Sequence, residues 1–144
     1  ATGLIPAIMK KLEEGTPLLG ICVGLQIMFE GSEENPSAKG LGIFKGMVRK
    51  INAPELKVPH MGWNSLDFSE PRLPLYDGLN EHPYVYFVHS YHAVPEDKSI
   101  ITATTEYGET LTAAVAKDNI MATQFHPEKS GDVGLKILQN FIEM

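Results

Sequence analysis

The feature that most constrains the fold is a glycine-flanked cysteine between an apolar run and a helical segment. Cys22 is the chain's only cysteine and lies in the sequence Gly-Ile-Cys-Val-Gly at 20–24. This order predicts a buried strand, a tight turn and a helix, which is the arrangement of a nucleophile elbow. Glycine is expected on both sides of the turn, because a side chain at Gly20 or Gly24 would crowd the neighbouring elements. The elbow places the sulfur at a helix N-terminus, where backbone N–H groups favour the thiolate.

The rest of the chain alternates helix and strand patterns. Helical spacing of apolar residues predicts amphipathic helices over 3–14 and 133–144, and a short helix over 25–29. Apolar, aromatic and β-branched runs predict strands over 16–21, 43–51, 84–88, 100–105, 111–117 and 120–125. Asp118-Asn119 is typical of a hairpin turn between the last two strands. We expect a loop over 31–42, loops with short strands over 54–83, and one α/β domain over 1–144.

The composition excludes several classes of protein. The chain has 144 residues, 43% of them hydrophobic and 21% charged, which is typical of one globular domain. A net charge of −6 offers no basic surface for nucleic acid. No apolar run approaches the roughly 20 residues of a membrane span, and the first residues lack the pattern of a signal peptide. A single cysteine forms no internal disulfide, so we expect a cytoplasmic protein with neither nucleic acid nor membrane as partner.

A second motif supplies a base and a carboxylate. The sequence Phe-His-Pro-Glu at 125–128 follows the last expected strand. Pro127 favours extended geometry at His126. Residues two apart in an extended segment point the same way, so we expect His126 and Glu128 to share a face. Cys22, His126 and Glu128 are the parts of a triad in which the imidazole takes the thiol proton and the carboxylate fixes the tautomer. Taken alone, each motif also fits a purely structural role.

The other four histidines give no metal-ligand pattern. His89 and His92 are three residues apart, which on a strand places them on opposite faces. His60 precedes Met-Gly-Trp-Asn in a loop, His82 precedes a proline, and neither has a ligand spacing with Cys22. We therefore expect no metal and no cofactor.

Together these motifs resemble those of the class I glutamine amidotransferases. The elbow at 20–26 and Phe-His-Pro-Glu at 125–128 are shared by the whole class. Pro-His-Met-Gly-Trp-Asn at 59–64 and Tyr-Phe-Val-His-Ser-Tyr at 86–91 resemble the glutaminase subunits of imidazole glycerol phosphate synthase, an enzyme of histidine biosynthesis. The resemblance covers about 3–144 and implies a three-layer, flavodoxin-like α/β fold with a mixed central sheet.

The same resemblance implies a glutaminase reaction. The Cys22 thiolate attacks the side-chain amide of L-glutamine, His126 gives a proton to the departing ammonia, and water releases glutamate from the thioester. The ammonia passes to a (β/α)₈ cyclase subunit that makes imidazole glycerol phosphate, so the implied assembly is a heterodimer.

The resemblance also assigns further residues by position. The N–H of Val23 is the implied oxyanion donor. The implied glutamine contacts are Gln26, Glu34, Ser90 and Tyr91. The implied cyclase-docking residues are Trp63, Asn64 and Lys129.

One family feature has no counterpart in the chain. The family takes a second oxyanion donor from a glycine-rich turn that would lie before Ala1, together with the first strands of the sheet. We therefore expect an incomplete sheet and weak activity of this chain alone, since losing one oxyanion donor costs about 10²–10³ in rate.

Three alternatives stay open. The first is another class I glutaminase, serving anthranilate, carbamoyl phosphate, pyridoxal phosphate or GMP synthesis. The second is a non-catalytic relative that only docks to a partner. The third is a cysteine hydrolase that uses the same triad on a different amide or peptide.

Overall fold

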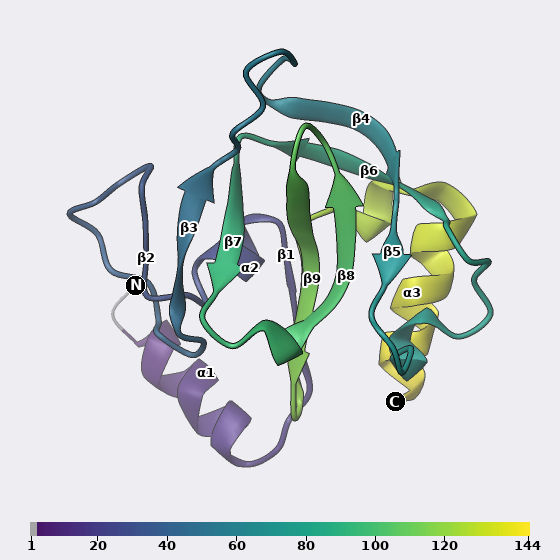
Figure 1. Ribbon diagram of the computed structural model, residues 1–144. Coiled ribbons are helices and arrows are strands. Elements are labelled where there is room, and N and C mark those ends of the chain that lie inside the picture. Colours follow the sequence, from purple (N-terminus) through teal and green to yellow (C-terminus); the bar gives the residue numbers. More distant parts are fainter. Residues whose placement is uncertain (1–2) are drawn as a thin grey trace.

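The structure, a computed structural model, describes residues 3–144 and has a five-stranded sheet at its centre, in the order β1-β10-β9-β8-β5 (Figure 1). Its strands are β1 (Leu18–Ile21), β5 (Asp67–Phe68), β8 (Ile101–Glu106), β9 (Thr110–Lys117) and β10 (Ile120–Thr123). The β1–β10 pair is parallel, whereas the β10–β9, β9–β8 and β8–β5 pairs are antiparallel. The sheet is therefore mixed, which confirms that part of the expected fold.

Two smaller sheets lie against this centre. A three-stranded sheet has the order β2-β3-β7, with β2 (Gly31–Ser32), β3 (Gly46–Lys50) and β7 (Tyr91–Pro95). A two-stranded antiparallel ribbon joins β4 (His60–Ser65) to β6 (Tyr84–His89) and crosses the upper end of the molecule in Figure 1. The two faces of this ribbon differ in burial, since buried His60 and exposed Met61 are neighbours on β4.

Alternation along the central strands builds one core on each face of the sheet. Ala114 and Met121 join a core that includes Ile137 of α3 (Gly131–Glu143). Their neighbours Val115 and Ala122 join the opposite core, which includes residues of α2 (Val23–Gln26) and β3. Period-two alternation thus covers both faces, giving the expected three layers.

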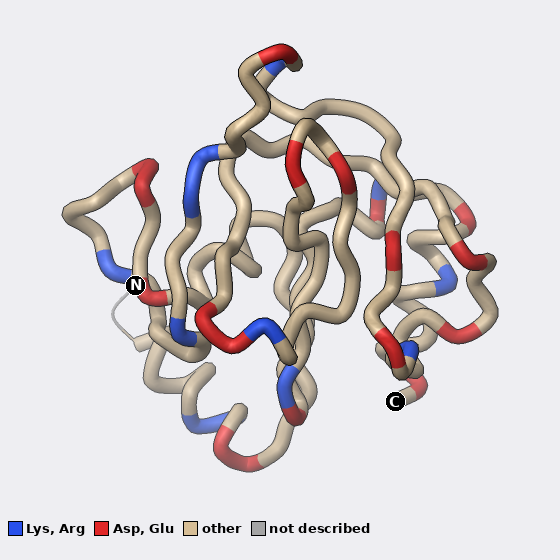
Figure 2. Tube along the Cα trace, viewed as in Figure 1, with Lys and Arg blue, Asp and Glu red and all other residues tan. Residues whose placement is uncertain are grey.

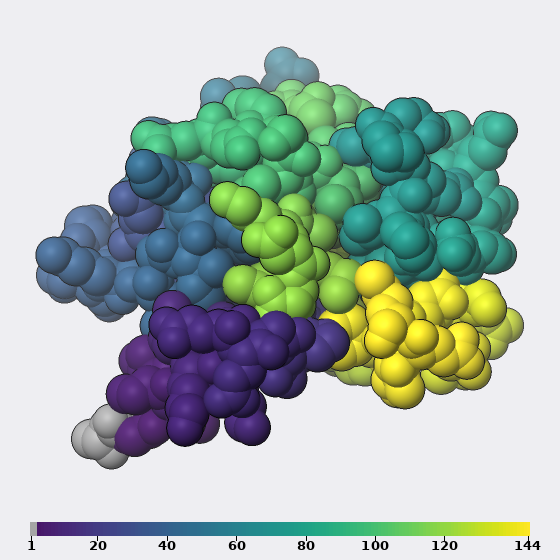
Figure 3. Space-filling model, turned by 90° about the horizontal axis from the view of Figure 1, so that it is seen from below, coloured from purple at the N-terminus to yellow at the C-terminus, as the bar shows by residue number. Residues whose placement is uncertain are grey.

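The N-terminal helix α1 (Leu4–Glu13) lies along one side of the molecule and buries none of its residues. Its C-terminal end is tied to the β9–β10 hairpin, because Asn119 Nδ2 donates to the carbonyl of Leu12 at 3.2 Å and to that of Thr16 at 2.7 Å. Figure 3 shows this helix in purple beside the yellow-green hairpin. The described residues also form three 3-10 turns: η1 (Pro74–Tyr76), η2 (Lys98–Ile100) and η3 (Pro127–Lys129).

Most of the expected elements are confirmed. Both terminal helices and the six expected strands are present, and Lys117 faces Ile120 across the two-residue hairpin, where Asp118 has a φ of 56°. The strand at Tyr91–Pro95 was not expected, since buried His92 and terminal Pro95 hide its pattern. A two-residue strand also lies in the expected loop, and the short helix spans Val23–Gln26 rather than 25–29. The placement of His60 in a loop is wrong, because His60 begins the six-residue strand β4 and pairs with His89 of β6.

Charges are mixed over the surface. Figure 2 shows basic and acidic residues interspersed on strands and loops alike. Across residues 3–144, none of the helices combines the length and the apolar character that a bilayer crossing requires.

The two glycines of the elbow differ in what surrounds them. A Cβ on Gly20 would lie 2.7 Å from the Met28 Cε and 3.0 Å from the Gly24 backbone, as expected for a crowded turn. A Cβ on Gly24 would meet nothing within 4 Å, so the expectation of crowding there is wrong. Gly24 lies inside α2 and leaves open space in front of its Cα.

We predict that Gly20→Ala lowers the free energy of unfolding by about 1–3 kcal/mol, because it overpacks the contact between β1 and α2. Gly24→Ala is the matched control, and we expect it to be neutral or to stabilise by up to about 1 kcal/mol, since alanine favours helix. Urea denaturation of both variants measures the difference. Equal stability of the two would contradict the packing described here.

Candidate active site

Cys22 sits on a strained turn directly after β1. Its φ is 56° and its ψ is −104°, and the N–H of Cys22 donates to the Thr123 carbonyl at 2.7 Å. The Cys22 carbonyl in turn accepts from the N–H groups of Leu25 and Gln26 and so begins α2. Positive φ at a residue other than glycine is uncommon, and such strain clusters at functional sites. The strand–turn–helix order expected for a nucleophile elbow is therefore present.

The parallel pairing of β1 with β10 brings the two motifs to one edge of the sheet. Ile21 is in register with Thr123, so Cys22 and the segment leading to His126 leave neighbouring strands at their carboxyl ends. The N–H of His126 donates to the Tyr86 carbonyl at 3.0 Å, which fixes this segment against β6. Side chains that follow adjacent parallel strands meet at the same sheet edge, where α/β proteins place their ligand sites.

His126 and Glu128 form the expected pair. The Nδ1 of His126 lies 2.8 Å from the Glu128 Oε2, and this contact makes Nδ1 the protonated nitrogen and leaves Nε2 as the base. The pair does not form along an extended strand, however. His126 is extended, but Glu128 lies in η3, which Pro127 begins, so a turn rather than strand alternation brings the carboxylate back to the ring.

The thiol of Cys22 has a raised pKa. Burial is the largest cause, and the negative charge of Glu128 adds to it. The Val23 N–H, the Gln124 side chain and the charge of Lys129 act in the opposite direction but do not outweigh burial. The Val23 N–H at the start of α2 favours the thiolate, as expected, but desolvation outweighs this effect and leaves the pKa raised. Such a sulfur needs a base to become nucleophilic.

Three of the expected glutamine-binding and oxyanion residues gather beside the elbow. Val23, Gln26 and Glu34 line one cavity of about 160 Å³. Ser90 and Tyr91 do not line it. The Tyr91 carbonyl reaches the cavity wall indirectly, since it accepts a hydrogen bond from the Gln26 Nε2 at 3.2 Å.

The expected docking residues do not share one surface. Trp63 is 56% exposed on β4, and Lys129 is exposed on η3. The Asn64 side chain donates to the Glu106 carbonyl at 2.8 Å and contacts the His60 Nε2 at 3.3 Å. Asn64 is thus bonded within the protein, on the opposite face of β4 from its neighbour, because successive side chains alternate along a strand.

Sequence reasoning missed Gln124. This side chain is fully buried, and its Nε2 donates to the Cys22 Sγ at 3.5 Å. The available signal was a glutamine within the mostly apolar segment 120–125 before His126, since a buried amide requires hydrogen-bond partners.

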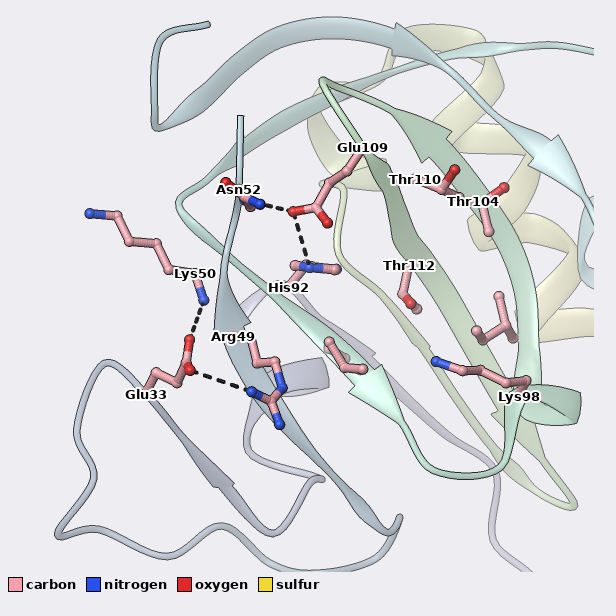
Figure 4. A pocket seen from close by; sticks show the side chains of 13 residues that line it. Glu33, Arg49, Lys50, Asn52, His92, Lys98, Thr104, Glu109, Thr110 and Thr112 are labelled. Atoms are coloured by element: carbon pink, nitrogen blue, oxygen red, sulfur yellow. Dashed lines mark hydrogen bonds and ion pairs between the residues drawn. The ribbon is translucent and has the colours of Figure 1, made fainter. Parts of the chain in front are cut away.

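A larger cavity lies elsewhere and contains none of the expected site residues. It measures about 640 Å³ and lies between the β3–β7 and β8–β9 pairs (Figure 4). Its carboxylates are already paired: Glu33 lies 3.6 Å from the Arg49 guanidinium, and Glu109 accepts from the Asn52 N–H at 2.6 Å. Among residues 3–144, no group of three or more His, Cys, Asp or Glu side chains is arranged to hold a metal ion.

Comparison with known proteins identifies the family of the chain. The sequence model of the family described as "Glutamine amidotransferase class-I" matches residues 1–144. The chain belongs to the class I glutamine amidotransferase family. This membership confirms the resemblance found in the elbow and in the Phe-His-Pro-Glu motif.

Curated relatives in this family share one protein name. The imidazole glycerol phosphate synthase subunit HisH of Synechococcus sp. (strain JA-3-3Ab) is 54% identical over 145 residues, covering 99% of this chain and 67% of the relative. The protein of the same name from Methanocaldococcus jannaschii is 52% identical over 137 residues, covering 95% of this chain and 68% of the relative. The chain thus spans about two thirds of the length of these relatives.

Solved structures support the fold. A crystal structure of a glutamine amidotransferase matches with a TM-score of 0.69 at 21% identity, covering 98% of this chain and 67% of that one. The structure of PurLQS from Thermotoga maritima matches with a TM-score of 0.73 at 19% identity, covering 97% of this chain and 67% of that one. Together with the mixed sheet, these likenesses confirm the expected class I amidotransferase fold.

We predict that alkylation of Cys22 by iodoacetamide is slow at neutral pH and still accelerates above about pH 9. The raised pKa keeps the sulfur protonated below it, so the reactive thiolate fraction grows as the pH rises through that value. Mass spectrometry of the peptide that carries Cys22 measures the rate. A free peptide of sequence 18–26 is the control and reaches its plateau at lower pH. A plateau below about pH 7 in the protein would instead indicate a resting thiolate–imidazolium pair.

Proposed function

We propose that the protein is a glutaminase subunit of imidazole glycerol phosphate synthase, hydrolysing L-glutamine and passing ammonia to a (β/α)₈ cyclase subunit. The observation that carries the proposal is the strained Cys22 beside the strand that leads to the His126–Glu128 pair. The names of the curated relatives support this member of the family over other class I glutaminases.

The proposed reaction begins with the thiol of Cys22. His126 Nε2 removes its proton, the sulfur attacks the amide carbon of glutamine, and the Val23 N–H stabilises the oxyanion. The imidazolium returns the proton to the amide nitrogen, the C–N bond breaks, and ammonia leaves from a γ-glutamyl thioester. His126 then takes a proton from water, the hydroxide attacks the thioester, and glutamate departs as the sulfur regains its proton. Glu128 holds the ring throughout and stabilises its charged form.

Passing ammonia directly to a partner has a physical reason. Free ammonia in neutral water is mostly protonated and is then no nucleophile. A cytoplasmic location is part of the proposal, since a catalytic free thiol is best preserved in a reducing compartment.

The outward face of the β4–β6 ribbon is the proposed cyclase-docking surface. Trp63 pairs with Tyr86 across the ribbon, with ring centroids 6.0 Å apart in an edge-on arrangement. Met61 and Tyr84 are also exposed on these strands. Clustered aromatic and methionine side chains are typical of the energetic centre of an interface. Lys129 on η3 supplies a positive charge for the same partner in this proposal.

We predict that Cys22→Ala and His126→Ala abolish glutamate release in an assay with glutamine and the cyclase subunit. Glu128→Gln should lower kcat by about 10²–10⁴, because the ring loses its orientation and its charge partner. His82→Ala, on an exposed histidine paired with Asp67, is the matched control and should retain activity. Cyclase binding without glutamate release by the parent would favour a docking-only relative. Equal turnover of other amides would favour a general cysteine hydrolase.

We predict that Trp63→Ala weakens binding of the cyclase subunit about tenfold or more, since exposed tryptophans dominate interfaces that bury them. Ile142→Ala is the matched control, because Ile142 is 79% exposed on the last turn of α3 and lies outside the proposed surface. Titration calorimetry of both variants gives the affinities. Unchanged binding by Trp63→Ala would remove the ribbon from the docking surface.

A further inference from the structure

Two glutamine side chains connect the sulfur of Cys22 to the backbone of β7. The Gln124 Nε2 donates to the Cys22 Sγ at 3.5 Å, and the Gln124 Oε1 accepts from the Gln26 Nε2 at 3.1 Å. The Gln26 Nε2 also donates to the Tyr91 carbonyl at 3.2 Å. Gln124 directly follows β10, Gln26 lies in α2 and Tyr91 begins β7, so the three bonds connect segments that are distant in the sequence.

The direction of each bond is set by the Tyr91 carbonyl. A carbonyl oxygen only accepts, so Gln26 must present its NH₂ group to Tyr91. The same nitrogen faces Gln124, which must therefore present its oxygen. Only the NH₂ group of Gln124 is then left to face the sulfur. An amide whose orientation is otherwise ambiguous is thus fixed as a donor to Cys22.

A second series of hydrogen bonds reaches the Tyr91 carbonyl from the β4–β6 ribbon. His89 Nδ1 lies 2.9 Å from this oxygen and must donate to it, so His89 Nε2 is the acceptor for the His60 Nδ1 at 2.9 Å. His60 Nε2 then accepts from the Asn64 Nδ2 at 3.3 Å. Asn64 is itself fixed, because its Oδ1 accepts from the Ser65 N–H at 2.8 Å. Backbone groups therefore set the proton arrangement at both ends.

Both histidines are neutral, as this arrangement requires. Burial lowers the pKa of His60 to about 4 and that of His89 to about 4. The charged forms of His60, His92 and His126 would all oppose protonation of His89. Rings of Phe87 and Tyr107 stack on His60 at 4.8 Å and 4.1 Å between centroids, so no carboxylate covers it from those sides.

We propose that Gln124 is a further catalytic residue, the neutral donor that stabilises the Cys22 thiolate, and that His89 and His60 are positioning residues that fix its orientation through the Tyr91 carbonyl. The inference rests on the proposed function, in which Cys22 is the nucleophile. A neutral donor suits this place, because it stabilises the sulfur anion without competing with His126 for the proton. A fully buried amide also needs these partners, since leaving it unpaired is costly.

The first experiment compares Gln124→Glu and Gln124→Met in the complete protein. Glutamate replaces the donor by an acceptor at the same length, and methionine removes the donor without adding charge. We expect the pH profile of Cys22 alkylation to shift upward by about one unit or more in both variants, so that the rate near neutral pH falls about tenfold. Gln139→Glu, the same change on α3 away from Cys22, is the matched control and should leave the profile unchanged.

The second experiment tests the hydrogen bond from His89 to the Tyr91 carbonyl by comparing a substitution that keeps the donor with one that removes it. The amide nitrogen of asparagine takes the place of a histidine Nδ1, so His89→Asn keeps a donor for the Tyr91 carbonyl, whereas His89→Leu removes it. We expect His89→Asn to retain the parent alkylation profile and His89→Leu to lower the rate near neutral pH about twofold to fivefold. His82→Leu, on an exposed histidine, is the control.

The outcomes separate this inference from the proposed function. If Cys22→Ala abolishes glutamine hydrolysis while folded Gln124→Glu and Gln124→Met keep the parent alkylation profile, only the role of Gln124 is overturned. If one Gln124 variant does not fold, as judged by circular dichroism, the other decides. If neither folds, equal profiles of the two His89 variants overturn the inference, and rescue by asparagine alone supports it. If Cys22→Ala remains active, the proposed function itself fails.

Discussion

The parallel pairing of β1 with β10 is the interaction on which the rest of the site depends. It is the one parallel pair in the five-stranded sheet described over residues 3–144, and it continues past the strands, where the Cys22 N–H donates to the Thr123 carbonyl. A shift of one residue would turn every side chain of β10 to the other face and exchange the two cores. Alternating burial of Met121 and Ala122 in opposite cores therefore fixes the register that brings the cysteine and histidine motifs to one edge.

Local chemistry made much of the site predictable from the sequence. Gly20 has no room for a side chain, and Pro127 begins the turn that returns Glu128 to His126, so both motifs carry their geometry within a few residues. The Asp118-Asn119 hairpin is equally local. Long-range packing was not predictable. The open space at Gly24 depends on what packs against α2, and the raised pKa of Cys22 depends on burial by segments distant in sequence.

The sequence identified residues of the β4–β6 ribbon, but it did not show on which face of the strand each of them lies. The sequence marks His60, Trp63 and Asn64 as one segment, yet alternation along β4 sends Trp63 outward and the other two inward. The outward face is aromatic and suits a partner, whereas the inward face holds a buried polar network.

The chemistry of Cys22 follows from competition between burial and nearby dipoles. Burial removes water from the sulfur and raises its pKa, while the Val23 N–H and the Gln124 amide act the other way without prevailing. These neutral dipoles are already oriented toward the sulfur, so they need no reorganisation when the negative charge forms. They therefore stabilise the thiolate most after the proton has moved to His126. A sulfur that is protonated at rest is also less open to chance oxidation, since the thiolate is the reactive form. Burial therefore favours a sulfur that is protonated at rest, and the Val23 and Gln124 donors stabilise the thiolate once His126 has taken the proton.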